Sequence, residues 1–123
     1  MPSALIVDDE ADVRFLLRQV IELDNHDITV AGEAASGEEA LAQWEEAKPA
    51  VIVLDNRMPG VSGLDVAEQI LREHPEQSII LFSAQLDVET LHRANELGIR
   101  ACLGKNDYFQ IPEAIRKYAP ASA

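Results

Sequence analysis

Cysteine is nearly absent from this chain, since Cys102 is the only one among 123 residues. A single cysteine forms no disulfide within the chain, and without neighbouring histidines it makes neither a zinc site nor a redox pair. Long apolar runs are absent too, because the longest fall far short of the roughly 20 residues that span a bilayer. The N-terminus has no signal-peptide pattern. We therefore expect a cytoplasmic protein without membrane contact, in which Cys102 is a small buried residue of a strand.

Basic residues are scarce as well, because 10 lysines and arginines face 22 acidic residues and the formal net charge is -12. Binding to a phosphate backbone needs clustered basic side chains. The composition therefore argues against direct contact with nucleic acid. The 47% of hydrophobic residues is enough for the core of one domain. We expect that domain to cover residues 1–118, and residues 119–123 to form a short C-terminal tail or linker stub.

Five short apolar runs, rich in β-branched residues, alternate with segments of helical periodicity. The expected strands are residues 4–7, 28–33, 51–54, 78–82 and 99–103. The first and third runs are continuous and β-branched rather than alternating, which is typical of strands covered by helices on both faces. Strict alternation of strand and helix predicts an α/β fold, in which right-handed crossovers build one doubly wound five-stranded parallel sheet with five helices.

Apolar residues at helical spacing mark the first and fourth helices. They are Val13, Leu16, Leu17, Val20 and Ile21 in the first, where they predict one buried stripe, and Val88, Leu91, Ala94 and Leu97 in the fourth. Ser36 and Glu39 fit a capping box that opens the second helix. Gly63 is expected near the start of the third helix, and Gly98 has the position of a glycine cap at the end of the fourth.

Polar residues follow four of the five apolar runs. Asp8 and Asp9 follow the first run, Asp55 the third, Ser83 the fourth and Lys105 the fifth. Parallel strands end on the same edge of a sheet, and ligands gather in the crevice outside those ends. If the first and third strands are neighbours, we expect these side chains to converge in one site.

Such a site is suited to a divalent cation and a phosphoryl group. Two carboxylates about 4 Å apart repel by roughly 4 kcal/mol at an effective dielectric near 20, so the acidic set needs a cation or a protonated member. Mg²⁺ takes one or two carboxylates, keeps several waters and leaves positions for phosphate oxygens. An aspartate is a nucleophile for phosphoryl groups, and a nearby lysine and hydroxyl offset charge on the phosphoryl oxygens.

The same residues, in this order and approximate spacing, resemble the receiver domains of two-component response regulators. The resemblance covers essentially the whole chain. It is carried by Asp8-Asp9, by Asp55 followed by Met58-Pro59 and Gly63, by Ser83-Ala84, and by Lys105. It implies the flavodoxin-like strand order 2-1-3-4-5 and a signalling switch that catalyses its own phosphorylation and dephosphorylation, rather than an enzyme with a separate substrate.

The resemblance also implies a role for each residue. Asp55 would be the phosphoacceptor, which forms 4-aspartylphosphate with a histidine kinase, a histidine phosphotransfer protein or a small phosphodonor. For Mg²⁺, Asp9 would be a direct ligand and Asp8 a ligand through water, with Asp55 and the backbone carbonyl of Arg57 as further ligands. Ser83 would be the hydroxyl that moves toward the phosphoryl group, and Lys105 the cation that pairs with it.

This chain departs from the family pattern at a few positions around the site. Cys102 stands where the family often has an aromatic residue. Asn106 stands where proline with a cis peptide is common, so we expect no cis bond there. Arg57 and Gln85 occupy positions that influence how long the phosphoryl group survives. Our hypothesis is that Gln85 orients a hydrolytic water while Arg57 shields or pairs with the phosphoryl group, so that the two residues act in opposite directions on its lifetime.

Three other functions compete with a phosphorylated receiver. A flavodoxin-like electron carrier fits poorly, because Asp8-Asp9-Glu10 would repel a flavin phosphate. A phosphatase with an aspartate nucleophile needs an acid two residues after Asp55, where Arg57 stands. The serious alternative is a degenerate receiver that acts as a docking module without phosphorylation. In either receiver function, we expect a downstream protein to bind the surface formed by the fourth helix, fifth strand and fifth helix.

Three aromatic residues are candidate anchors on that surface: Tyr108, Phe109 and Tyr118. Core packing is at least an equal interpretation for Phe109. The sequence leaves open the identity of the kinase and of the target. It also leaves open whether phosphorylation produces a homodimer, and whether the receiver stands alone or belongs to a longer regulator.

Overall fold

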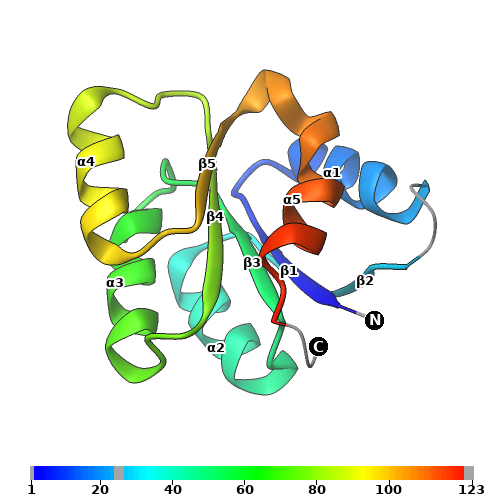
Figure 1. The fold of residues 1–123 in the computed structure, drawn as a ribbon, viewed down its shortest axis with the longest axis horizontal. Coiled ribbons are helices and arrows are strands. Elements are labelled where there is room, and N and C mark those ends of the chain that lie inside the picture. The colour runs from blue at the N-terminus through cyan, green and yellow to red at the C-terminus, as the bar shows by residue number, and fades with distance from the viewer. Residues whose placement is uncertain (1, 24–26, 121–123) are drawn as a thin grey trace.

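The computed structural model describes residues 2–23 and 27–120, and in these residues five parallel strands form one sheet in the order β2-β1-β3-β4-β5 (Figure 1). The strands are β1 (Ser3–Val7), β2 (Thr29–Ala34), β3 (Val51–Leu54), β4 (Ser78–Ser83) and β5 (Ala101–Gly104). The helices are α1 (Ala11–Leu23), α2 (Gly37–Ala47), α3 (Gly63–Glu73), α4 (Val88–Leu97) and α5 (Ile111–Tyr118), with a 3₁₀ segment η1 (Lys105–Gln110) before α5. The predicted fold class and strand order are confirmed.

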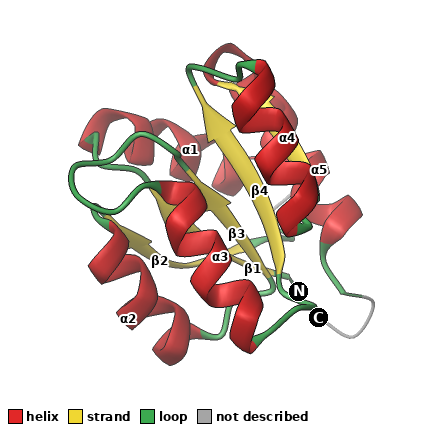
Figure 2. Cartoon of the chain, turned by 90° about the vertical axis from the view of Figure 1, so that its left-hand side faces the viewer, coloured by secondary structure: helices red, strands yellow, loops and turns green. Residues whose placement is uncertain are grey.

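Helices cover both faces of the sheet, with α1 and α5 on one side and α2, α3 and α4 on the other (Figures 1 and 2). Successive strand side chains point to opposite faces. In β1, Ala4 and Ile6 pack with α1 and α5, whereas Leu5 and Val7 pack with α2 and α3. Because both faces are covered, nearly every position of the central strands β1 and β3 is buried, and their first charged residues come directly after the strands end. This explains the continuous apolar runs.

Two predicted helix caps are present. The Ser36 hydroxyl accepts from the Glu39 N–H at 3.2 Å, while the Glu39 carboxylate accepts from the Ala35 N–H at 3.3 Å. This is the expected capping box, with the reciprocal bond made one residue before the cap. Gly98 ends α4 in the left-handed conformation at φ 93°, and its N–H bonds to the carbonyl oxygens of Ala94 and Asn95.

Some apolar residues lie on the surface, which corrects the predicted helix faces. Leu16 is 37% exposed, so it does not belong to the buried stripe of α1. In α4, Val88 and Leu91 are 82% and 41% exposed, and Ala94 is the one residue that is fully buried. The physical reason is the position of α4 at one side of the sheet (Figure 1), where Ala94 and Leu97 in its C-terminal half pack with Leu81 of β4 and Cys102 of β5.

The region around β5 also differs from expectation. The strand begins at Ala101 rather than at residue 99, and η1 was not predicted. Cys102 is half-buried instead of buried. Phe109 is 63% exposed, so its interpretation as a core residue is wrong. Tyr108 is 38% exposed and contacts Phe109 edge to face with ring centroids 6.1 Å apart.

Three further expectations concern a cis peptide bond, a membrane span and the C-terminal tail. No peptide bond in the described residues is cis, as expected for the chain after Lys105. Within the same residues, none of the helices has both the length and the apolar character that a membrane span requires. Residues 121–123 of the predicted tail lie outside the described residues.

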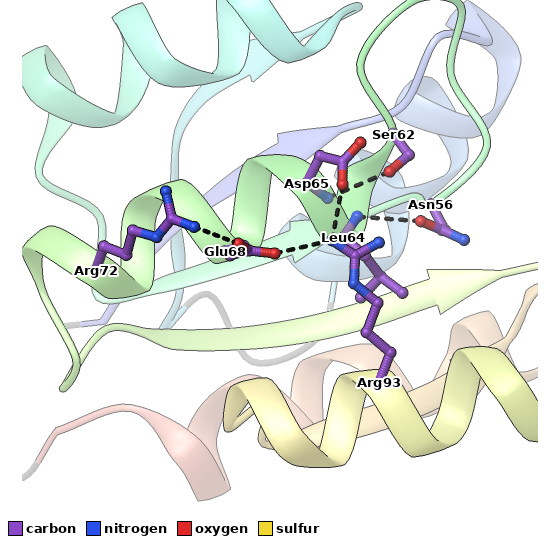
Figure 3. A network of polar contacts seen from close by, with 7 residues as sticks. All are labelled: Asn56, Ser62, Leu64, Asp65, Glu68, Arg72 and Arg93. Atoms are coloured by element: carbon purple, nitrogen blue, oxygen red, sulfur yellow. Dashed lines mark hydrogen bonds and ion pairs between the residues drawn. The ribbon is translucent and has the colours of Figure 1, made fainter.

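An ionic network joins α4 to α3 (Figure 3). One Arg93 nitrogen donates to Asp65 at 2.7 Å and to Glu68 at 3.0 Å. The second oxygen of Glu68 accepts from Arg72 at 2.6 Å, within α3. Since α4 buries only Ala94 completely, this polar contact supplements a thin apolar interface. The network therefore helps to hold α4 against α3.

We predict that Arg93→Ala accelerates amide hydrogen exchange in α4 by about two- to fivefold, because an exposed ion pair contributes roughly 0.2–1 kcal/mol. Arg72→Ala is the matched control, since it removes a partner of the same Glu68 without touching α4. Hydrogen-exchange mass spectrometry of both variants measures the difference. Equal exchange in α4 of the two variants would contradict the assigned role of Arg93.

Candidate functional site

The carboxyl ends of the strands bring the predicted side chains together. β1 and β3 are neighbours, with Val7 opposite Leu54, so Asp8 and Asp55 follow adjacent strand ends. The Lys105 ammonium lies 2.5 Å from Asp8 Oδ2 and 3.8 Å from Asp55 Oδ2. Two carboxylates from different strands thus share one cation. The predicted convergence of these three side chains at one edge of the sheet is therefore confirmed.

Ser83 lies at the same edge. It is the last residue of β4 and is paired with Gly104, directly before Lys105. Its hydroxyl oxygen accepts from the Gln85 N–H at 3.4 Å. The Lys105 ammonium also lies 5.3 Å from the centroid of the Phe82 ring, a cation–π distance. The lysine is therefore held by carboxylates on one side and an aromatic ring on another.

The site is a cluster of buried polar residues at the edge of an apolar core. Four polar residues among those described are buried: Asp8, Asp55, Ser78 and Ser83. Three of them lie at this edge, whereas Ser78 lies at the opposite end of β4 and donates to the Tyr118 carbonyl oxygen at 2.6 Å. Burial of an ionised carboxylate is costly unless it is paired or hydrogen-bonded. Here Asp8 is fully buried and Asp55 is 4% exposed.

Burial sets the protonation of Asp55. Desolvation first, and then the negative charge of Asp8, raise the pKa of Asp55 from 3.8 to about 6. Lys105 and the Arg57 N–H act in the opposite direction, and the N–H donates to Asp55 Oδ1 at 3.2 Å. Asp55 is thus a carboxylate at neutral pH, but one whose charge is poorly compensated.

The residues after β1 form a tight acidic turn. Asp8 Oδ1 accepts from the Glu10 N–H at 2.9 Å. The carboxylate oxygens of Asp8, Asp9 and Glu10 can all be found within 4.8 Å of one another. Asp9 and Glu10 are exposed, so their side chains are free to turn toward a cation held by buried Asp8. Oxygen donors of this kind fit a hard divalent ion such as Mg²⁺.

The main chain after Asp55 is packed against the start of α3. A Cβ on Gly63 would lie 2.8 Å from the Asn56 Cα and closer still to the Asp55 carbonyl oxygen, so no larger residue fits. The Gly63 N–H donates to the Asn56 carbonyl oxygen at 2.9 Å, and the Asn56 side chain accepts from the Leu64 N–H at 3.0 Å (Figure 3). These contacts fix the direction in which the Asp55 loop leaves the strand.

Sequence reasoning missed some residues of the site. Glu10 was not among the predicted metal ligands, although its position after Asp8-Asp9 was a signal for it. Asn56 was missed as well. Its side chain accepts from the Leu64 N–H at the start of α3, eight residues later, and a contact over this separation leaves no local sequence pattern. Arg57 is exposed in the turn after β3, and its backbone N–H is bonded to Asp55 as described above.

Comparisons with known proteins agree with this geometry. The family model described as response regulator receiver domain matches residues 4–116. Chemotaxis protein CheY of Thermotoga maritima is 39% identical over 80 residues, which are 65% of this chain and 65% of that protein. Response regulator GacA of Pseudomonas protegens is 38% identical over 81 residues, which are 65% of this chain and 37% of that protein. The alignments thus span less than two thirds of the length of these relatives.

A solved structure gives the same result. The crystal structure of a DNA-binding response regulator of the LuxR family from Staphylococcus aureus superimposes with a TM-score of 0.88 at 26% identity. The superposition covers 96% of this chain and 98% of that chain. The fold is therefore shared over nearly all of both chains.

We predict that Asp55→Asn stabilises the protein by about 1–3 kcal/mol at about pH 7.5 in the absence of divalent cations. The ordinary pKa of 3.8 is raised to about 6 in the folded protein. Ionisation is therefore disfavoured by folding, and the penalty grows as the pH rises from about 4 to about 6. The asparagine removes this penalty, so the gain should disappear below about pH 4.

Urea unfolding across this pH range measures the effect. Asp12→Asn, at an exposed position in the first turn of α1, is the control and should show a small difference with little pH dependence. A stability gain for Asp55→Asn that is equal at both ends of the range would contradict the electrostatic origin.

Proposed function

The chain belongs to the response regulator receiver domain family, whose members act as signalling switches, and we propose that it switches by accepting a phosphoryl group on Asp55. The observation that carries the proposal is the buried Asp55 carboxylate, 3.8 Å from the Lys105 ammonium and next to the acidic turn. The donor would be a phosphohistidine of a histidine kinase or phosphotransfer protein, or a small phosphodonor. Residues 1–118 would form this receiver and residues 119–123 a tail or linker stub.

The chemistry assigned to Asp55 is nucleophilic attack on phosphorus. One carboxylate oxygen forms the new O–P bond while the bond between phosphorus and the donor breaks, and the donor leaves with that electron pair. Attack requires an ionised carboxylate, and the pKa of about 6 leaves Asp55 ionised at neutral pH. The Lys105 ammonium offsets negative charge on the transferred group. The chain would thus catalyse a reaction on itself.

Mg²⁺ is the cofactor that this donor set fits. Asp9 would hold it directly and Asp8 through water, with Asp55 and the Arg57 backbone carbonyl completing the protein ligands. When bound, the ion neutralises charge that gathers on the phosphoryl oxygens. The close cluster of Asp8, Asp9 and Glu10 supports a cation site at this position.

The readout of the switch would be a change in protein contacts. After phosphorylation, the Ser83 hydroxyl would donate to a phosphoryl oxygen and Lys105 would pair with that group. Exposed apolar residues on α4, Val88 and Leu91, support a partner surface in the region of α4, β5 and α5. The downstream partner would be a protein, and homodimer formation on phosphorylation would be one form of the same response.

Intact mass spectrometry tests the proposal. After incubation with a small phosphodonor and Mg²⁺, the unaltered chain should gain one phosphoryl adduct, and omission of Mg²⁺ should prevent it. Asp55→Asn should gain none, while the control Asp12→Asn should react like the unaltered chain. Absence of an adduct in a folded chain would contradict phosphorylation and would favour the phosphorylation-independent docking module.

We further predict opposite effects on the lifetime of the adduct from two exposed residues at the rim, Gln85 and Arg57. Gln85→Ala should slow dephosphorylation, because the side chain no longer orients water. Arg57→Ala should accelerate it, because the phosphoryl group is less shielded. One hydrogen bond contributes about 1 kcal/mol, so each change should be roughly fivefold. Decay of the adduct in timed mass spectra gives the rates, and an unchanged rate in either variant would refute the hypothesis.

A further inference from the structure

Arg14 in α1 reaches the acidic turn without belonging to it. Its Nη1 donates to the Asp8 carbonyl oxygen at 2.7 Å, and its Nε donates to Glu33 at 3.2 Å. We infer that Arg14 is a positioning residue that sets the Mg²⁺ affinity of the site through the main chain of Asp8. The inference rests on the proposed function, because it concerns the cation that assists phosphorylation.

The Asp8 carbonyl has a particular need for this donor. Asp8 is the first residue after β1 and is fully buried. Its N–H donates to the Ala34 carbonyl oxygen at 3.0 Å, and its carboxylate is bonded by the Glu10 N–H and by Lys105. Arg14 supplies the donor for the remaining polar group. A buried carbonyl left without a partner costs about 1–3 kcal/mol, so loss of Arg14 favours rotation of the turn that carries the metal ligands.

Arg14 is itself held in place by β2. Glu33, paired with Ile6 across the sheet, accepts from Arg14 on one oxygen and from Arg18 on the other, the latter at 2.7 Å. The Arg14 side chain is only 19% exposed. A planar guanidinium can donate in two fixed directions at once, to Asp8 and to Glu33, which a single ammonium does poorly. The arrangement therefore joins the acidic turn to the end of β2.

The sign of the effect separates positioning from simple electrostatics. Removal of a positive charge near a cation site should strengthen Mg²⁺ binding by Coulomb attraction. Removal of a group that orients the ligands should weaken it, and such partners of metal ligands typically contribute 10–100-fold in affinity. Arg14 and Arg18 lie on the same helix and bond the same Glu33, but of the two only Arg14 also donates to the Asp8 carbonyl oxygen. Arg18 is thus a matched control for charge.

Calorimetric titration of the unphosphorylated chain with Mg²⁺ tests the inference. Arg14→Ala should bind Mg²⁺ roughly tenfold more weakly, whereas Arg18→Ala should bind it as tightly as the unaltered chain or more tightly. The Mg²⁺ concentration for half-maximal phosphorylation should rise by the same factor in Arg14→Ala, with the rate largely restored at saturating Mg²⁺. If Arg14→Ala does not fold, Glu33→Gln, which loosens Arg14 but leaves it in place, should weaken binding by about two- to fivefold.

Several outcomes would overturn the inference. Equal or tighter Mg²⁺ binding by Arg14→Ala, in a setting where the unaltered chain binds the ion, would refute the positioning role alone. If Arg18→Ala weakened Mg²⁺ binding as much as Arg14→Ala, the effect would come from loss of a contact with Glu33 and not from the bond to the Asp8 carbonyl. If the unaltered chain binds no Mg²⁺, both this inference and the cofactor of the proposed function fail.

Discussion

The candidate site depends on two buried carboxylates that share one lysine. Asp8 and Asp55 follow adjacent strands, and Lys105 contacts both of them from the far edge of the sheet. Carboxylates this deeply buried are tolerated only with compensating charge. The compensation is incomplete, because the pKa of Asp55 remains raised to about 6. A carboxylate pair that is incompletely neutralised favours a further cation nearby, and the proposed metal and phosphoryl chemistry relies on this imbalance.

The remainder of the fold fixes the positions of these charged side chains. Apolar side chains on both faces of the sheet fix the strand ends, and the contact between Gly63 and the Asp55 main chain fixes the loop. Arg14 donates both to the Asp8 carbonyl oxygen and to Glu33, and it thereby joins the turn after β1 to β2. Helix α4 carries apolar residues on the surface, and an ionic network supplies part of its packing against α3. A paired, buried site next to a helix that buries only Ala94 completely is an arrangement that suits a switch.

The sequence predicted a parallel sheet with Asp8, Asp55, Ser83 and Lys105 at one edge, because parallel strands end on the same edge. The strand order that makes the first and third strands neighbours came from the family resemblance. The sequence was not sufficient for contacts made by long side chains across elements, such as Arg14 to the Asp8 carbonyl, since these depend on the spacing between packed helices and strands. Helical periodicity located α4 correctly. It could not show that Val88 and Leu91 face solvent, because burial there depends on where the sheet ends.

A crystal structure of the chain with Mg²⁺ and beryllofluoride, a phosphoryl mimic, tests the central claim most directly. The mimic should be bonded to Asp55, with the ion beside Asp8 and Asp9, Lys105 turned toward the fluorides, and the Ser83 hydroxyl donating to one of them. A mimic that binds elsewhere, or Mg²⁺ bound at the acidic turn with Asp55 left unmodified and Lys105 still on Asp8, would contradict the account.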